Sequence, residues 1–518
     1  MAEPELGTPQ LGVVAAGHPV SAGCGAEALR AGGNAVDAAI GAMLASLACE
    51  PMLTGLGAGG YMLIVSPEAP PVLLDFFVEA PGRGADPGAR AALVPVGVSF
   101  GAAIQEFNIG AASVGAFGVP AGVCDASRRF GSMPLGELVK PAAALARDGV
   151  PLGPQQAYVI EILADIATST PESAALFAPE GRLLGAGDTI RQPELADALE
   201  RLGAEGAQPF YGGDIGSAIV DWLEARGGML TRADLAAYRV LDRPPVRVPY
   251  RGREVLTNPP PSAGGILLAH AFTMLGADPG PPGVELVIAV MERAQRERTP
   301  EFLAGLDDPQ FGQRFLGRAE TGRPPVEPPE PTLRGPLGST THISVIDRSG
   351  MACSVTCSNG SCSGVIVPGT GLHLNNMLGE QDLNPLGFHR HAPGRRLPSM
   401  MAPTIVLGEG RPELVLGSAG SNRIRSAILQ TIIRVIDDGM LAPDAVEAPR
   451  LHVEDDVVYV EPGIDVATLE AAGRTIGRFR DRNLFFGGVQ AAQRAAGGEF
   501  WGGGDPRRGG AAVVVQAG

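Results

Sequence analysis

The feature that most constrains this chain is an abrupt change of character at residue 340. A proline-rich run from Arg323 to Pro336 ends just before it, and a strand-like sequence begins with the pair Thr340 and Thr341. Cleavage between Ser339 and Thr340 would make Thr340 an N-terminal residue. Its α-amine, with an ordinary pKa of about 7.7–8.0, could then act as the base for its own hydroxyl. The alternative is that both threonines are ordinary β-favouring residues, and only the rest of the chain decides between the two.

Composition limits the classes of protein that this chain can be. It has 518 residues, of which 45% are hydrophobic and 19% are charged, so it can bury a substantial core. The length alone suggests about three domains, although large single folds are an exception. A net charge of −16 argues against a nucleic-acid partner, because the phosphate backbone requires a basic protein surface.

The N-terminal residues, the most apolar stretch and the cysteines indicate the cellular compartment in which the protein is expected. Residues 1–6 lack the basic and apolar regions of a signal peptide, and the most apolar stretch, residues 38–48, is too short to span a bilayer. A chain of this size needs no disulfide framework, so we expect its six cysteines to be reduced thiols. We therefore predict a cytoplasmic protein with no membrane partner.

The order of helix and strand signals predicts layered sheets covered by helices. Residues 19–50 indicate two helices, with Asn34 as the N-cap of the second. Residues 54–60 form a glycine-rich loop before a strand, the reverse of the order in a dinucleotide-binding motif, so we predict close packing there instead. Residues 115–240 are largely helical. The elements predicted after residue 340 are the hairpins 340–347/351–358 and 404–407/413–417, a helix at 423–438, and strands at 457–460 and 511–515.

Short motifs occur along almost the whole chain in the order in which one known family carries them. They are Asn34–Ala39, Gly55–Met62, Gly118–Gly122, Thr340–Ser344, Leu374–Asn376, Met401–Thr404 and Gly417–Gly420. Each string alone is weakly specific, but their common order is not. On these motifs the chain resembles the γ-glutamyltranspeptidase (γ-glutamyltransferase, glutathione hydrolase) family of N-terminal-nucleophile hydrolases.

The resemblance implies a four-layer αββα sandwich made as a precursor that cuts itself. Residues 1–339 would form a helix-rich large subunit that ends in the linker 323–339. Residues 340–518 would form a strand-rich small subunit, and the two subunits together would make one αββα unit.

The resemblance also assigns catalytic roles. Thr340 would attack a γ-glutamyl amide, and water or an acceptor amine would resolve the acyl-enzyme. Ser358 occupies the position of a second hydroxyl beside the nucleophile, although it could also be an ordinary serine at a strand end. The backbone N–H groups of Gly420 and Ser421 would form the oxyanion hole, a role compatible with a turn before a helix. No cofactor and no metal are implied.

The expected glutamate pocket departs from the family pattern. Phe77 stands where the family places an arginine for the glutamyl α-carboxylate, and a bidentate arginine contact is hard to replace. Ser399 keeps one hydroxyl of a serine pair, whereas Met400 replaces the other. Asn359 is offset by one residue from an asparagine that contacts the acyl group. Glu380 would replace the aspartate that receives the substrate ammonium group.

The segment 384–396 is short and lacks the lid tyrosine of many relatives, so we expect hydrolysis to be favoured over transfer. Arg390, Arg395 and Arg396 in this region could supply positive charge in place of the missing arginine, or could simply lie at the surface.

Two other clusters invite a different function. Cys353, Cys357 and Cys362 could suggest a metal site, but their spacing matches no familiar zinc pattern, so we predict buried core thiols with Cys362 in an oxidisable loop position. His373, His389 and His391 could form a metal site or a pH switch, and we favour ordinary loop histidines.

The sequence is therefore compatible with three candidate functions. The first is a self-processing N-terminal-Thr amidohydrolase for γ-glutamyl compounds. The second is an acylase for a different amide side chain, like the related cephalosporin acylases, and the third is a non-catalytic homologue. The expected partners are a small-molecule amide substrate and the two subunits of the cleaved precursor. The sequence does not decide whether the protein forms a homo-oligomer.

Overall fold

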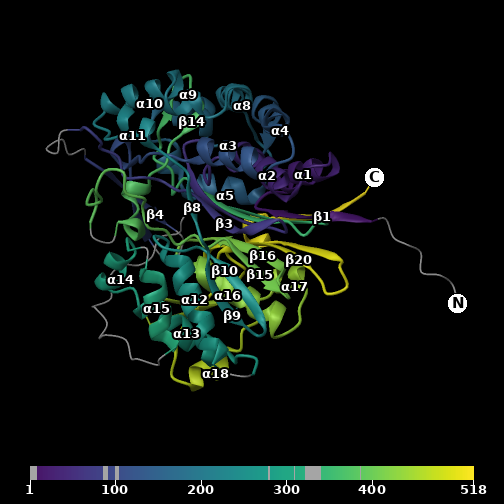
Figure 1. Ribbon diagram of the computed structural model, residues 1–518. Helices are drawn as coiled ribbons and strands as arrows, with labels where there is room; N and C mark the ends of the chain where they lie inside the picture. Colours follow the sequence, from purple (N-terminus) through teal and green to yellow (C-terminus); the bar gives the residue numbers. More distant parts are fainter. Residues whose placement is uncertain are drawn as a thin grey trace.

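The computed structural model describes residues 9–85, 92–99, 104–277, 280–308, 310–320, 340–384, 387–454 and 456–517. Two antiparallel sheets lie face to face in its centre (Figure 1). The seven-stranded sheet has the order β22 (Ala511–Gln516), β1 (Gln10–Ala16), β11 (Thr341–Asp347), β12 (Ala352–Ser358), β2 (Gly59–Ser66), β3 (Ala69–Phe76) and β8 (Leu241–Arg243). The six-stranded sheet has the order β21 (Phe500–Gly504), β20 (Gly488–Arg494), β16 (Arg411–Ala419), β15 (Thr404–Gly408), β10 (Arg253–Thr257) and β9 (Val246–Tyr250).

Helices cover the outer face of each sheet (Figure 1). The seven-stranded sheet is covered mainly by α1 (Pro19–Arg30), α2 (Ala35–Cys49), α3 (Val119–Phe130), α4 (Leu135–Asp148), α5 (Pro154–Ile162) and α8 (Pro193–Glu205). The other sheet is covered mainly by α12 (Ala263–Gly276), α13 (Val284–Arg296), α15 (Phe311–Glu320), α16 (Arg423–Ile436) and α17 (Ala442–Glu447). This is the αββα sandwich that the sequence predicted.

Shorter elements complete the two helical layers and the loops. The helices are α6 (Ala164–Ala167), α7 (Pro171–Phe177), α9 (Gln208–Tyr211), α10 (Asp214–Glu224), α11 (Arg232–Ala237), α14 (Pro300–Gly305) and α18 (Val466–Ala471). The strands are β4 (Val94–Ser99), β5 (Ile104–Ile109), β6 (Val150–Pro151), β7 (Thr189–Ile190), β13 (Ile366–Val367), β14 (Leu372–His373), β17 (Leu451–Glu454), β18 (Val457–Val460) and β19 (Thr475–Arg478).

The break between α1 and α2 confirms the predicted N-cap. The side chain of Asn34 accepts from the backbone N–H groups of Val36 and Asp37, and Asp37 accepts from the N–H of Asn34 in return. The N–H of Ala35 donates to Asp347 at the end of β11, 2.9 Å away. Helix α2, buried along its whole length, is thereby fixed against the strand that begins directly after the predicted nucleophile.

The hairpin of β11 and β12 confirms a second prediction and supplies a polar layer between the sheets. His342 Nδ1 lies 2.8 Å from Thr356 Oγ1, and its Nε2 lies 2.9 Å from Ser344 Oγ. Ser344 Oγ donates to the carbonyl of Gln490 in the opposite sheet, at 3.0 Å. Burial lowers the pKa of His342 to about 3, so the ring is neutral and ties the sheets together without a buried charge.

The chain segments that would form the two subunits interleave in this fold. Strand β1, from the N-terminal part, lies between β11 and β22 from the C-terminal part, and β12 pairs with β2. The predicted linker 323–339 and Ser339 lie outside the described residues. Among the described helices, none is both long and apolar enough to cross a bilayer.

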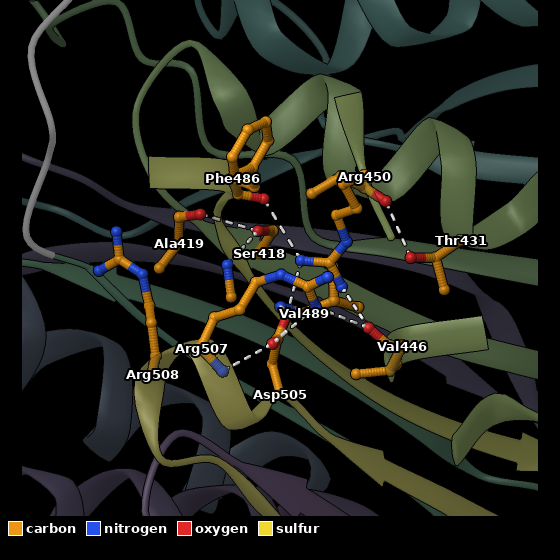
Figure 2. Close-up of polar contacts among 12 residues, drawn as sticks. Ser418, Ala419, Thr431, Val446, Arg450, Phe486, Val489, Asp505, Arg507 and Arg508 are labelled. Carbon is orange, nitrogen blue, oxygen red and sulfur yellow. Dashed lines mark hydrogen bonds and ion pairs between the residues drawn. The ribbon is translucent and has the colours of Figure 1, made fainter. Parts of the chain in front are cut away.

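A buried ionic network anchors the C-terminal turn (Figure 2). Asp505 accepts from Arg450 Nη1 at 2.6 Å, from Arg507 Nη1 at 3.2 Å and from the N–H of Val489 at 2.8 Å. Arg507 also donates from Nε to Glu461 Oε1 at 2.7 Å. The network joins the turn after β21 to β20 and to the segment after α17. The turn between β21 and β22 is thereby held against the six-stranded sheet.

The glycine-rich segment 54–60 packs as predicted. A Cβ at Gly60 would lie 2.6 Å from the carbonyl oxygen of Thr356, so the backbones of β2 and β12 approach too closely for a side chain. Cys353 and Cys357 are buried free thiols, also as predicted. The oxidisable position expected for Cys362 is wrong, because the thiol is fully buried and burial raises its pKa.

Candidate active site

Thr340 and Ser358 meet at the open end of the β11–β12 hairpin. Thr340 Oγ1 donates to Ser358 Oγ at 3.2 Å, and Ser358 Oγ also accepts from the N–H of Gly360 at 3.0 Å. Both side chains are buried. Because Thr341 pairs with Cys357 in the antiparallel register, the residues just beyond that pair are brought together. The hydroxyl pair expected from the sequence therefore exists in space, and its catalytic role stays a prediction.

Thr340 lines a pocket of about 410 Å³. Residues predicted for the site that share this pocket are Phe77, Ser358, Glu380, Ser399, Met400 and Ser421. The further lining residues are Gly360, Met377, Asp382, Leu383, Met401 and Ile424. Most of the predicted acyl site is thus gathered around one hydroxyl. Asp382 is a member of the site that the sequence did not indicate.

Asn359 is the exception. Its Nδ2 donates to the carbonyl of His373 at 3.0 Å, and a Cβ at Gly55 would lie 3.1 Å from the same nitrogen. The next residue, Gly360, lines the pocket instead. The expected contact between Asn359 and the acyl group is therefore corrected, because the offset of one residue turns the amide into the loop packing.

One wall of the pocket is apolar and firmly held. Phe77 is buried and stacks on Tyr61, with ring centroids 5.3 Å apart. Its carbonyl accepts from Tyr238 Oη at 2.7 Å, which fixes the backbone on which the ring stands. Met377 and Met400 extend this wall. Ser399 Oγ accepts from the N–H of Met401 at 3.0 Å, so this hydroxyl also supports the local backbone.

Two acids, Glu380 and Asp382, also line the pocket. Glu380 Oε1 accepts from the N–H of Ser361 at 2.9 Å and from Ser361 Oγ at 3.1 Å. Burial raises the pKa of Glu380 to about 7, and the nearby Asp382 adds to that rise. Burial also raises the pKa of Asp382, opposed by the charge of Arg298 and by a hydrogen bond from Ser421. Among the described lining residues of the pocket, none is Arg, Lys or His.

The predicted oxyanion loop joins β16 to α16. Gly420 and Ser421 both have a positive φ, 119° and 50°, and Ser421 Oγ donates to Asp382 Oδ2 at 2.6 Å. These two residues lie just before the N-terminus of α16, where backbone N–H groups are free of helical partners. The geometry is compatible with the oxyanion role, which stays a prediction.

Two of the three arginines suggested as substitutes for Phe77, Arg395 and Arg396, already have partners of opposite charge. Arg396 is buried and pairs with Asp75 at 3.3 Å and with Glu79 at 3.6 Å, and its guanidinium lies 4.8 Å from the centre of the Tyr238 ring. Arg395 pairs with Asp307. The hypothesis that Arg395 and Arg396 receive an anionic acyl group is therefore wrong, because their charges already have partners outside the pocket.

A further buried acid, Glu50, lies behind the nucleophile. Side chains alternate along β11, so Thr341 points away from the pocket of Thr340 and donates to Glu50 Oε1 and Oε2 at 3.2 and 3.0 Å. Burial raises the pKa of Glu50 to about 7, opposed by the Thr341 hydroxyl and by the charge of Arg508. Glu50 and Arg508 also line a separate cavity of about 430 Å³.

The predicted alternative of a metal site finds no support, since no group of three His, Cys, Asp or Glu side chains in the described part of the chain could hold an ion.

The family profile described as Gamma-glutamyltranspeptidase matches residues 21–515. The chain belongs to the γ-glutamyltranspeptidase family. The sequence resemblance is thereby confirmed over nearly the full length.

Members of the γ-glutamyltranspeptidase family with different names are similar to this chain. The acylase ACY 1 proenzyme of Pseudomonas sp. (strain SE83) is 33% identical over 482 residues, covering 89% of this chain and 86% of that protein. The glutathione hydrolase proenzyme of Escherichia coli (strain K12) is 30% identical over 511 residues, covering 90% and 86%. A cephalosporin acylase from Bacillus halodurans superposes with a TM-score of 0.83 at 25% identity, covering 100% of this chain and 98% of that one.

Proposed function

We propose that this protein is a self-cleaving, N-terminal-Thr amidohydrolase that works as an acylase, on an acyl group without a glutamyl α-carboxylate. One observation carries the proposal. The pocket beside Thr340 has an apolar wall around Phe77, two acids, Glu380 and Asp382, and no cationic lining residue among those described. The similarity to the acylase ACY 1 proenzyme supports the same choice.

The electrostatics of the pocket disfavour a γ-glutamyl group. Its α-carboxylate would enter a partly desolvated site beside Glu380 and Asp382, where like charges repel and none of the described lining residues is an arginine that could offset the loss of water. A neutral acyl chain would contact Phe77 and Met400 without that cost. We therefore propose that γ-glutamyl amides, the first expectation from the sequence, are poorer substrates than other acyl amides.

Self-cleavage and amide hydrolysis would use the same hydroxyl. In the precursor, Thr340 Oγ1 attacks the carbonyl carbon of Ser339, the peptide bond becomes an ester, and water hydrolyses the ester to free the α-amine of Thr340. In the mature enzyme this amine takes the proton of Oγ1 as the hydroxyl attacks the substrate carbonyl. The amine then returns the proton to the leaving amine, and water resolves the acyl-enzyme.

The hydroxyl of Ser358 would orient the nucleophile, because it already holds Thr340 Oγ1 at 3.2 Å. The N–H groups of Gly420 and Ser421 would stabilise the oxyanion, and loss of one such donor typically costs about 10²–10³ in rate. We further propose that water hydrolyses the acyl-enzyme faster than an acceptor amine takes up its acyl group. The short segment 384–396 has no tyrosine that could close over the acyl-enzyme.

Four p-nitroanilides test the acyl preference: butanoyl, 4-aminobutanoyl, glutaryl and γ-glutamyl. They combine the presence and absence of the amine with the presence and absence of the carboxylate on chains of similar length. We expect kcat/KM for the two carboxylate-free substrates to exceed that for the two carboxylates by about tenfold or more, a difference of about 1.4 kcal/mol. A preference for γ-glutamyl or glutaryl anilide would overturn the proposal, and Thr340→Ala serves as the inactive control.

A further inference from the structure

The loop that presents the predicted oxyanion donors adopts a conformation that its sequence does not favour. Ser421 has φ 50°, in the left-handed region where a residue with a side chain costs about 1–2 kcal/mol. Gly420, at φ 119°, carries no such cost. A side-chain contact must therefore help to hold Ser421 in place.

Asp382 supplies that contact from the wall of the pocket. It lies in the 3₁₀ turn Gln381–Leu383, and its Oδ2 accepts from Ser421 Oγ at 2.6 Å. Asp382 and Ser421 both line the pocket of Thr340. A hydrogen bond from a hydroxyl to a carboxylate is of the stronger, charge-assisted kind.

The rest of the loop is held by other contacts. Asn422 Oδ1 accepts from Arg298 Nη1 at 3.0 Å, and its Nδ2 donates to Glu454 at 3.2 Å. The guanidinium of Arg423 lies 4.8 Å from the centre of the Phe485 ring. These contacts fix the start of α16, whereas the Ser421–Asp382 bond joins two residues that line the pocket of Thr340.

We infer that Asp382 is a positioning residue for the oxyanion hole, which acts through the hydroxyl of Ser421 and aims the loop N–H groups at the developing oxyanion. The inference rests on the proposed function of Thr340. Asp382 need not touch the substrate. Its removal would leave binding nearly intact and would misplace a donor that is needed in the transition state.

Three substitutions separate this role from a structural one. Asp382→Ala and Ser421→Ala each break the bond, and we expect kcat to fall by about 10–100-fold with KM within about twofold, since small misplacement of catalytic groups costs about that much. Ser421→Gly should recover most of the lost kcat, because glycine adopts φ 50° without a hydroxyl to hold it. The double variant Asp382→Ala/Ser421→Gly should then equal Ser421→Gly alone.

Matched controls accompany the cycle. Asp465 Oδ2 accepts from Thr468 Oγ1 at the same distance of 2.6 Å at the start of α18, an exposed contact away from the pocket, so Asp465→Ala should keep the wild-type kcat. Rates are measured with butanoyl p-nitroanilide, whose acyl chain carries no charge that Asp382 could attract or repel, on variants whose mass shows cleavage before Thr340. If Asp382→Ala does not fold, the Ser421→Ala and Ser421→Gly pair decides alone.

Two results would overturn the inference. One is an equal loss of kcat in Ser421→Gly and Ser421→Ala, which would mean that the hydroxyl acts directly. The other is a further fall caused by Asp382→Ala in the Ser421→Gly background, which would mean that Asp382 acts by another route. Neither result resembles a failure of the proposed function, which would show as an inactive wild type or as an active Thr340→Ala variant.

Discussion

Thr341 and Glu50 form a hydrogen-bonded pair directly behind the predicted nucleophile, with both carboxyl oxygens within 3.2 Å of the threonine hydroxyl. The pair ties the first residue of β11 to the end of α2. The carboxyl is buried, with a pKa raised to about 7, so it titrates near neutrality although it belongs to no pocket around Thr340.

This raised pKa predicts that two proteins differ in their free energy of unfolding by an amount that depends on pH. The two are the Thr340→Ala variant and the double variant Thr340→Ala/Glu50→Gln. A carboxyl whose folded pKa lies above its unfolded value stabilises the fold fully below the unfolded value, and that contribution is lost as pH rises through the folded value. Between pH of about 4.5 and about 7, the Glu50 protein should lose about 3 kcal/mol relative to Glu50→Gln. Urea unfolding at several pH values measures this difference, and a pH-independent difference would refute the assignment.

Ser358→Ala should slow acyl transfer without unfolding the protein. The substitution removes the acceptor that holds Thr340 Oγ1 at 3.2 Å, so we expect single-turnover acylation to slow by about 10–100-fold. Ser358→Thr keeps a hydroxyl at the same place and should retain most of the rate. Equal rates in wild type and Ser358→Ala would contradict the orienting role.

Arg396 should matter for stability and not for substrate charge. Arg396→Met leaves Asp75 and Glu79 buried with fewer partners, which typically costs about 3–5 kcal/mol in unfolding free energy. Arg395→Ala removes a partly exposed pair with Asp307 and should cost less than about 1 kcal/mol. Neither arginine lines the pocket, so KM for glutaryl p-nitroanilide should be unchanged in Arg395→Ala, and a clear rise would return that arginine to the site.

Asp505→Asn should destabilise the C-terminal turn strongly. The carboxylate neutralises Arg450 and Arg507 in a buried setting, and their charges hold its pKa below the ordinary value against the effect of burial (Figure 2). Its loss leaves excess buried positive charge, and we expect a cost of about 3–5 kcal/mol. The exposed pair of Asp308 and Arg314 provides the matched control, since Asp308→Asn should cost less than about 1 kcal/mol. Similar melting temperatures for both variants would contradict this role.

Local signals predicted the elements of the fold well. The N-cap at Asn34 and the hairpin after Thr340 depend on neighbouring residues, whose preferences can be recognised in the sequence. Ser358 and Glu380 were expected at the site from the family resemblance, and both line the pocket.

Long-range contacts account for what the sequence did not indicate. Glu50 lies 291 residues from Thr341, and Arg396 lies 321 residues from Asp75, so neither pair leaves a local pattern. Asp382 was missed because its role depends on Ser421, in a loop on the other side of β15 and β16 in the chain. Asn359 was misplaced because a shift of one residue in a turn reverses the direction of a side chain.

Self-cleavage before Thr340 can be tested by intact mass spectrometry of the purified protein beside a Thr340→Ala variant. We expect the wild type to yield two fragments, residues 1–339 and residues 340–518, while the variant stays one chain. A wild-type protein that remains a single uncut chain would rule out self-cleavage before Thr340 and would favour a non-catalytic homologue.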